Sequence, residues 1–85
     1  MKDHYCRVCG LYSEEKPWGE DGKSPAYLIC QCCGVESGYE DYTLESTIEY
    51  REQWIANGAK WFDLKRKPEN WNLEEQMRNI PDEYK

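Results

Sequence analysis

The sequence contains few of the aliphatic residues from which small domains usually build a core. Leucine, isoleucine, valine and phenylalanine together supply twelve of the 85 residues, or about 14%, which is below the ~20% at which disorder is expected. Four tryptophans and seven tyrosines supply large apolar surfaces instead. A core this thin needs a covalent or metal cross-link at this chain length. The sequence therefore predicts one small unit that is stabilised by more than hydrophobic burial.

Other absences exclude several classes of protein. No apolar run exceeds a few residues, so we expect neither a membrane span nor a secretory leader. The chain offers no glycine loop for phosphates and no Ser-His-Asp set, so we expect no enzymatic activity. Its net charge is −6, and its one basic cluster, residues 65–67, is short and flanked by acids. Because phosphate binding requires clustered cations, these features favour a protein partner over a nucleic acid or a membrane. We expect the protein to be cytoplasmic.

Cysteine is abundant and regularly spaced. Two C-x-x-C turns are each followed at once by a glycine, and 20 residues lie between them. The four cysteines are Cys6, Cys9, Cys30 and Cys33. One such turn presents two thiolates to one ion, and glycine lets the chain leave the turn in a left-handed conformation. Two copies predict a closed tetrahedral site for one Zn²⁺ per chain.

Alternative roles for the cysteines are open. A rubredoxin-type iron centre has the same spacing. A disulfide framework would need an oxidising compartment and an even number of cysteines, whereas the chain has five. We expect the extra cysteine, Cys32, to be a small buried side chain. The alternatives are an oxidation-sensitive thiol and a metal ligand in place of Cys30 or Cys33, although the usual spacing favours those two. His4 could replace one cysteine as a ligand, but we expect it to be solvated.

The patterns predict a small α+β fold. Residues 1–42 form a zinc ribbon in which the two C-x2-C-G knuckles lie on short β-hairpins, and residues 26–30 form its best strand. Residues 43–85 form an extension of one or two helices that packs on the ribbon to give a single compact unit. The four tryptophans are expected in the core of this unit more than on a binding face.

Capping patterns place the helices. Ser46 and Glu49 have the form of a capping box, and Gly58 is a stop signal, which predicts a helix at about 47–57. Three- and four-residue spacing joins the members of its stripe, which is expected to pack on the ribbon: Ile48, Arg51 and Ile55, and Tyr50 and Trp54. A second helix is predicted at about 73–79, and the tail after it is expected to be frayed.

The chain from Tyr5 onward resembles the small bacterial cysteine-rich CPCC domain and its uncharacterised relatives. Those proteins carry a C-x-x-C-G turn, a loop, an Ile-Cys-x-x-Cys turn and an acidic segment. The matching residues are Cys6, Cys9, Gly10, Ile29, Cys30, Cys33, Glu36, Glu40 and Asp41, followed by Arg51, Trp54, Gly58 and Trp61. Arg7 and Gln31 stand where that domain has prolines. The resemblance implies a cytoplasmic bacterial zinc-ribbon protein and brings no catalytic activity with it.

These observations favour a non-enzymatic, zinc-binding protein-interaction module. One form of it is an inhibitor or immunity-like protein, because small acidic proteins can neutralise basic partners. A nucleic-acid-binding zinc ribbon is the alternative, and a redox- or metal-responsive protein that acts through Cys32 is a further one.

Overall fold

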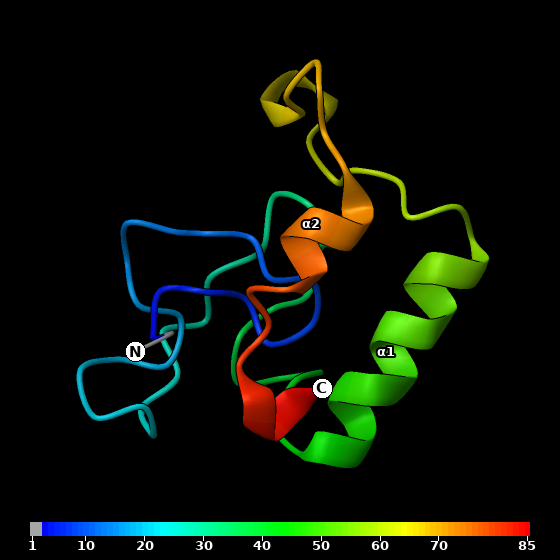
Figure 1. Cartoon of the computed structure of the whole chain (residues 1–85). Coiled ribbons are helices and arrows are strands. Elements are labelled where there is room, and N and C mark those ends of the chain that lie inside the picture. The colour runs from blue at the N-terminus through cyan, green and yellow to red at the C-terminus, as the bar shows by residue number, and fades with distance from the viewer. Residues whose placement is uncertain (1–2) are drawn as a thin grey trace.

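The computed structural model describes residues 3–85, so Met1 and Lys2 of the predicted ribbon domain lie outside the described residues. Its helices are α1 (Leu44–Ala56), the 3-10 helix η1 (Leu64–Arg66), α2 (Leu73–Met77) and the 3-10 helix η2 (Asp82–Tyr84). The N-terminal half is a set of loops, coloured blue to green, and α1 runs along one side of them (Figure 1). Within the described part, no helix has the length and apolarity needed to cross a bilayer.

The predicted β-hairpins are wrong, because no strand forms between residues 3 and 85. Each cysteine turn is closed by one isolated antiparallel bridge: Tyr5–Tyr12 in the first and Ile29–Glu36 in the second. A strand needs consecutive pairs, and the chain leaves both turns too soon to make them. Pro17 interrupts the segment after the first turn, and Gly38 bends the second away with a φ of +91°. The α+β class is therefore corrected to a loop-and-helix fold.

Helix α1 begins earlier than the predicted 47–57 because its N-cap is Thr43 and not Ser46. The Ser46 N–H donates to Thr43 Oγ1 at 3.0 Å, and the Thr43 N–H donates to Ser46 Oγ at 3.2 Å. The capping box therefore lies three residues upstream, and Ser46 plays the part that was assigned to Glu49. The stop at Gly58 is confirmed, with a φ of +98° directly after the helix.

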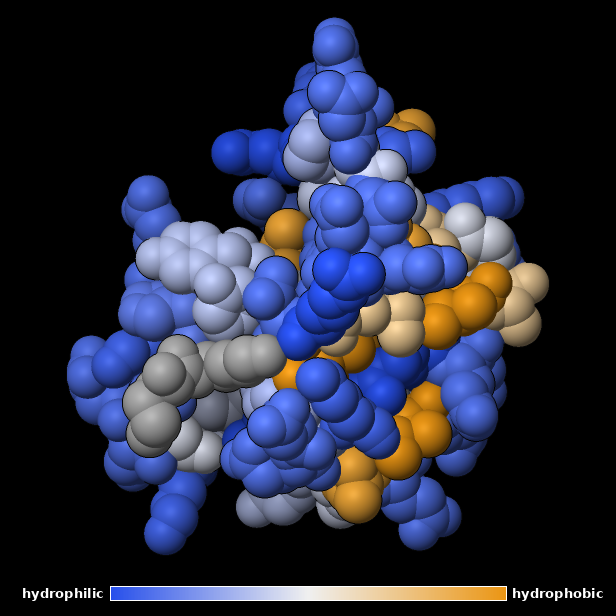
Figure 2. All heavy atoms as spheres, in the orientation of Figure 1, coloured by the Kyte–Doolittle hydropathy of each residue, from blue (hydrophilic) through white to orange (hydrophobic). Residues whose placement is uncertain are grey.

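The face of α1 that turns toward the cysteine loops agrees with the predicted stripe at Arg51 and Trp54 but not at Ile55. Thr47, Arg51 and Trp54 are buried, whereas Leu44 and Ile55 are 48% and 38% exposed. In the view of the whole molecule in Figure 2, most surface atoms are hydrophilic, and hydrophobic atoms lie along the side on which α1 lies. The helix thus buries a cation and leaves aliphatic side chains in solvent.

The C-terminal segment is fastened to the rest of the chain. Helix α2 is shorter than the predicted 73–79, and its N-cap Asn72 accepts a hydrogen bond from the Glu75 N–H at 3.0 Å, as the capping pattern indicates. The expectation of a frayed tail is wrong. Its residues form η2, which contacts α1, and the Tyr84 carbonyl accepts a hydrogen bond from Arg51.

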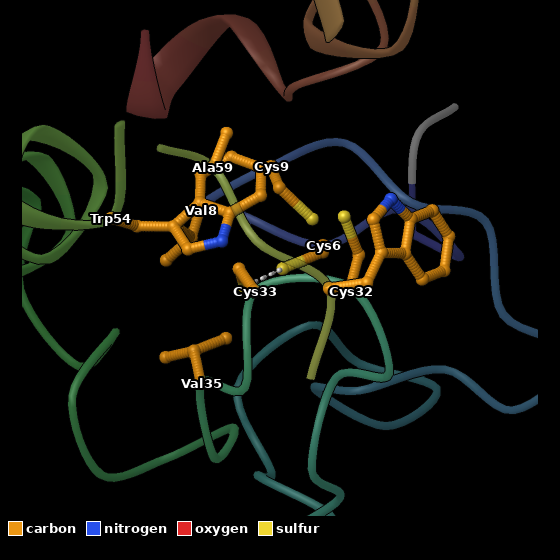
Figure 3. Close-up of a cluster of buried hydrophobic side chains, with 9 residues drawn as sticks. Cys6, Val8, Cys9, Cys32, Cys33, Val35, Trp54 and Ala59 are labelled. Carbon is orange, nitrogen blue, oxygen red and sulfur yellow. Dashed lines mark hydrogen bonds between the residues drawn. The ribbon is translucent and has the colours of Figure 1, made fainter. Parts of the chain in front are cut away.

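Tryptophan and cysteine side chains build the interior. Trp54 and Trp61 belong to the buried cluster that holds most of the cysteines (Figure 3), and Trp71 packs edge-on against Trp61 with ring centroids 5.6 Å apart. Trp18 is 8% exposed and donates from Nε1 to Asp41 Oδ2 at 3.1 Å. The aromatic residues therefore fill the core, as aliphatic residues do in larger domains.

Candidate metal centre

The two cysteine turns share one backbone hydrogen-bond pattern. In the first turn, N–H groups donate from Cys6 to Leu11 at 2.9 Å, from Gly10 to Cys6 at 3.0 Å and from Ser13 to His4 at 2.8 Å. In the second turn, they donate from Cys30 to Val35 at 2.8 Å, from Gly34 to Cys30 at 2.9 Å and from Ser37 to Leu28 at 2.9 Å. Every donor and acceptor of the second turn has its equivalent in the first. The turns are therefore two copies of one knuckle.

A left-handed glycine ends each knuckle, as the spacing predicts. Gly10 has a φ of +83° and Gly34 a φ of +81°, a conformation that costs other residues free energy. Gly10 is constrained a second time by α2 and the residues after it. A Cβ atom there would lie 3.2 Å from the Ile80 nitrogen and within van der Waals overlap of the Gln76 carbonyl oxygen.

The knuckles bring four cysteine sulfurs into one cluster. The Sγ atoms of Cys6, Cys9, Cys30 and Cys33 all lie within 4.8 Å of one another. The Sγ–Sγ distance is 3.7 Å from Cys6 to Cys33, which Figure 3 shows as a dashed line, and 3.6 Å from Cys9 to Cys30. A tetrahedral ion with metal–sulfur bonds of ~2.3 Å holds its sulfurs about 3.8 Å apart. The donor set therefore fits a metal ion, and all five cysteines are free of disulfides.

The sulfurs of the cluster lie close enough to shift one another's pKa. Burial raises the pKa of Cys9 and of Cys33, because a buried thiolate is poorly solvated. Hydrogen bonds from the thiols of Cys33, Cys6 and Cys9 lower the pKa of Cys30. A divalent cation among the sulfurs would favour the thiolate form of all four.

Side chains from the C-terminal half support the knuckles. The Tyr50 hydroxyl donates to the Cys33 carbonyl at 3.1 Å. Gln76 Nε2 donates to the Cys9 carbonyl at 3.2 Å, and Gln76 Oε1 accepts from Trp71 Nε1 at 2.7 Å. The sequence analysis missed these contacts. Gln76 and Cys9 are 67 positions apart, and no local pattern links them.

Cys32 and His4 lie outside the sulfur cluster. Cys32 is fully buried, and its Sγ accepts from Gln76 Nε2 at 3.3 Å. A hydrogen bond from Cys9 lowers the pKa of Cys32. His4 Nδ1 donates to the Ser13 carbonyl at 2.8 Å, and its ring stacks on Tyr12 with centroids 5.4 Å apart. Both residues thus have structural contacts of their own.

The fold and site define a small double-knuckle protein with a four-cysteine cluster that can hold a metal ion. No family model matches the chain, and no solved structure matches it. The chain is 32% identical, over an alignment 94 positions long, to the uncharacterized protein YozI of Bacillus subtilis (strain 168). The alignment covers 92% of this chain and 73% of the relative. The chain belongs to the family of this Bacillus protein, and its likeness to the CPCC domain stays a prediction.

Proposed function

We propose that the protein binds one Zn²⁺ ion per chain through Cys6, Cys9, Cys30 and Cys33, and that the ion has a structural role. The observation that carries the proposal is the Sγ spacing of 3.6 and 3.7 Å between the two knuckles. Zinc is favoured over iron because closed four-thiolate sets are typical of structural zinc sites. Such a set leaves no coordination position for a reacting water, which supports a non-enzymatic role.

A structural ion would also stabilise a fold that has few aliphatic residues in its core. Each knuckle has a single β-bridge, so within residues 3–85 no sheet holds the two knuckles together. Structural zinc contributes about 10–16 kcal/mol in small zinc-binding peptides near neutral pH. A contribution of that order would offset the small aliphatic core. The metal would take the place of the predicted hairpins as the element that joins the halves of the site.

Native mass spectrometry of the chain and two cysteine variants tests the metal proposal. The wild type is expected to carry one zinc ion, and Cys9→Ser is expected to lose it because a ligand is removed. Cys32→Ser is the matched control, because its sulfur is buried beside the cluster but outside it. A wild type without metal would contradict the proposal. A Cys32→Ser variant that loses the ion would contradict the ligand set.

The proposed role in the cell is that of a protein-interaction module, of which an inhibitor or immunity-like protein is one form. Support comes from the exposed aliphatic side of α1, where Leu44 and Ile55 are 48% and 38% exposed, and from the net charge of −6. The basic cluster at η1 supports nucleic-acid binding less well, since Arg66 faces Asp63 at 4.0 Å. The buried position of Cys32 likewise favours packing over redox sensing.

Affinity capture from the native host at low salt tests the interaction role. A captured protein should be recovered with the wild type and lost with a Leu44→Lys, Ile55→Lys double variant. Glu52→Gln is the control, because Glu52 is an exposed residue of the same helix. Recovery of no protein at low salt, or full recovery with the double variant, would contradict the role assigned to α1.

A further inference from the structure

Helix α1 buries its only basic residue. Arg51 is 7% exposed, while Leu44 and Ile55 on the same helix remain 48% and 38% exposed. Leu44, Arg51 and Ile55 lie seven and four positions apart, so they share one side of the helix, and the structure buries the charged residue of the three. Hydrophobic burial alone would favour the reverse, because aliphatic side chains gain and charges lose free energy on leaving water. Something on the inner side of α1 must therefore attract a cation.

The direct contacts of Arg51 do not supply a negative charge. Its Nε donates to the Val8 carbonyl at 2.6 Å, and its Nη2 donates to the Arg7 carbonyl at 2.7 Å and to the Tyr84 carbonyl. All three acceptors are neutral. Within residues 3–85, no carboxylate lies within ion-pair distance of this guanidinium. A buried charge without a counter-charge is costly.

The hydrogen bonds of Arg51 place its guanidinium beside the first cysteine knuckle. Arg7 and Val8 are the two residues between Cys6 and Cys9, so their carbonyls place the guanidinium against the back of the first knuckle. Burial lowers the pKa of Arg51, and electrostatic interactions with Cys6, Cys9 and Cys33, followed by one with Glu52, act against this decrease. Guanidinium groups remain protonated in proteins, so a positive charge stays beside the sulfurs.

We propose that Arg51 is the compensating cation of the metal centre, a positioning residue that offsets the negative charge of the four thiolates from behind the first knuckle. The inference rests on the proposed function, because four thiolates around one divalent ion leave a net charge of about −2. The same guanidinium binds the Tyr84 carbonyl. It therefore also joins the metal centre to η2.

Metal affinity in three variants of the full chain tests this role, measured with Zn²⁺ against a competing chelator. Arg51→Gln keeps hydrogen-bond donors but removes the charge, and it is expected to weaken zinc binding about 10- to 100-fold, as loss of an outer-shell partner typically does. Arg51→Lys keeps the charge and is expected to lose much less. Arg66→Gln is the control, because the Arg66 side chain is 64% exposed, and its affinity should match the wild type.

Two results would overturn the inference. Equal losses in Arg51→Lys and Arg51→Gln would show that the fixed donor geometry matters and the charge does not. Wild-type affinity in Arg51→Gln would show that neither matters. A wild type that binds no zinc would instead contradict the metal site itself, so the two proposals fail in distinguishable ways.

A double-mutant cycle separates charge compensation from a folding defect. Cys30→His would replace one thiolate by a neutral ligand and lower the negative charge of the centre by one; Cys30 is the most exposed of the four cysteines. The fold-loss caused by Arg51→Gln should then be smaller in the Cys30→His background than in the wild type. Equal fold-losses of zinc affinity in the wild-type and Cys30→His backgrounds would overturn the inference. A failure to bind zinc in both backgrounds would do the same.

Discussion

Replacement of Gly10 by alanine tests how tightly the C-terminal helix closes on the first knuckle. The left-handed φ of +83° costs an alanine about 1–2 kcal/mol. The new Cβ would overlap the Gln76 carbonyl oxygen and lie 3.2 Å from the Ile80 nitrogen. Both neighbours are backbone atoms, which cannot move aside as a flexible side chain would. Overpacking of this kind costs a further ~1–3 kcal/mol, so the total expected loss is about 2–5 kcal/mol.

Gly22→Ala supplies the matched control for backbone strain alone. Gly22 has a φ of +70°, and its Cβ would meet no atom within 4 Å, so only the ~1–2 kcal/mol of strain is expected. The assay is chemical denaturation of both variants at one fixed concentration of free zinc, because bound metal shifts apparent stability. Equal losses in the two variants would refute the reasoning, since α2 would then not constrain the knuckle.

Three further predictions follow from the helix cap, an exposed carboxylate and the metal. Thr43→Ala should destabilise the fold by about 1 kcal/mol, because it removes the N-cap oxygen of α1; unchanged thermal denaturation would count against the cap. Hydrogen bonds from the Lys23 N–H and from Ser24 lower the pKa of Asp21 below 3.8. The stability that these bonds add should be complete above pH 3.8 and be lost as the pH falls through the lower pKa of the folded state. Carboxyl ¹³C NMR would measure that pKa, and a value at or above 3.8 would contradict the prediction. Chelation should abolish the near-ultraviolet circular dichroism of the tryptophans, since no sheet in the described part of the chain holds the knuckles. A signal that survives chelation would show a fold independent of metal.

The candidate site was largely predictable because its pattern is local. Two C-x-x-C-G turns impose the same hydrogen bonds wherever they occur, and the sulfurs of Cys6, Cys9, Cys30 and Cys33 do meet within 4.8 Å. The strands were not predictable by the same argument. A strand depends on how many pairs follow the first, and here polar residues and Gly38 end the pairing at one bridge.

The face of α1 was predictable only in part. The three- and four-residue spacing placed both Arg51 and Ile55 on the stripe that packs on the ribbon, and the structure buries Arg51 but leaves Ile55 38% exposed. The spacing does not say what holds Arg51 inside: the backbone carbonyls of Arg7 and Val8, more than forty positions away, accept its hydrogen bonds. No local signal records such a partner, and the same is true of the contact between Gln76 and Cys9.

X-ray absorption at the metal edge, on protein isolated from its own host, tests the central claim most directly. The account predicts a zinc edge and four sulfur neighbours at about 2.3 Å, with no oxygen or nitrogen ligand. An iron edge would keep the ligand set but contradict the choice of metal. Three sulfurs with a lighter fourth ligand, or no bound metal, would contradict the closed four-cysteine centre formed by Cys6, Cys9, Cys30 and Cys33.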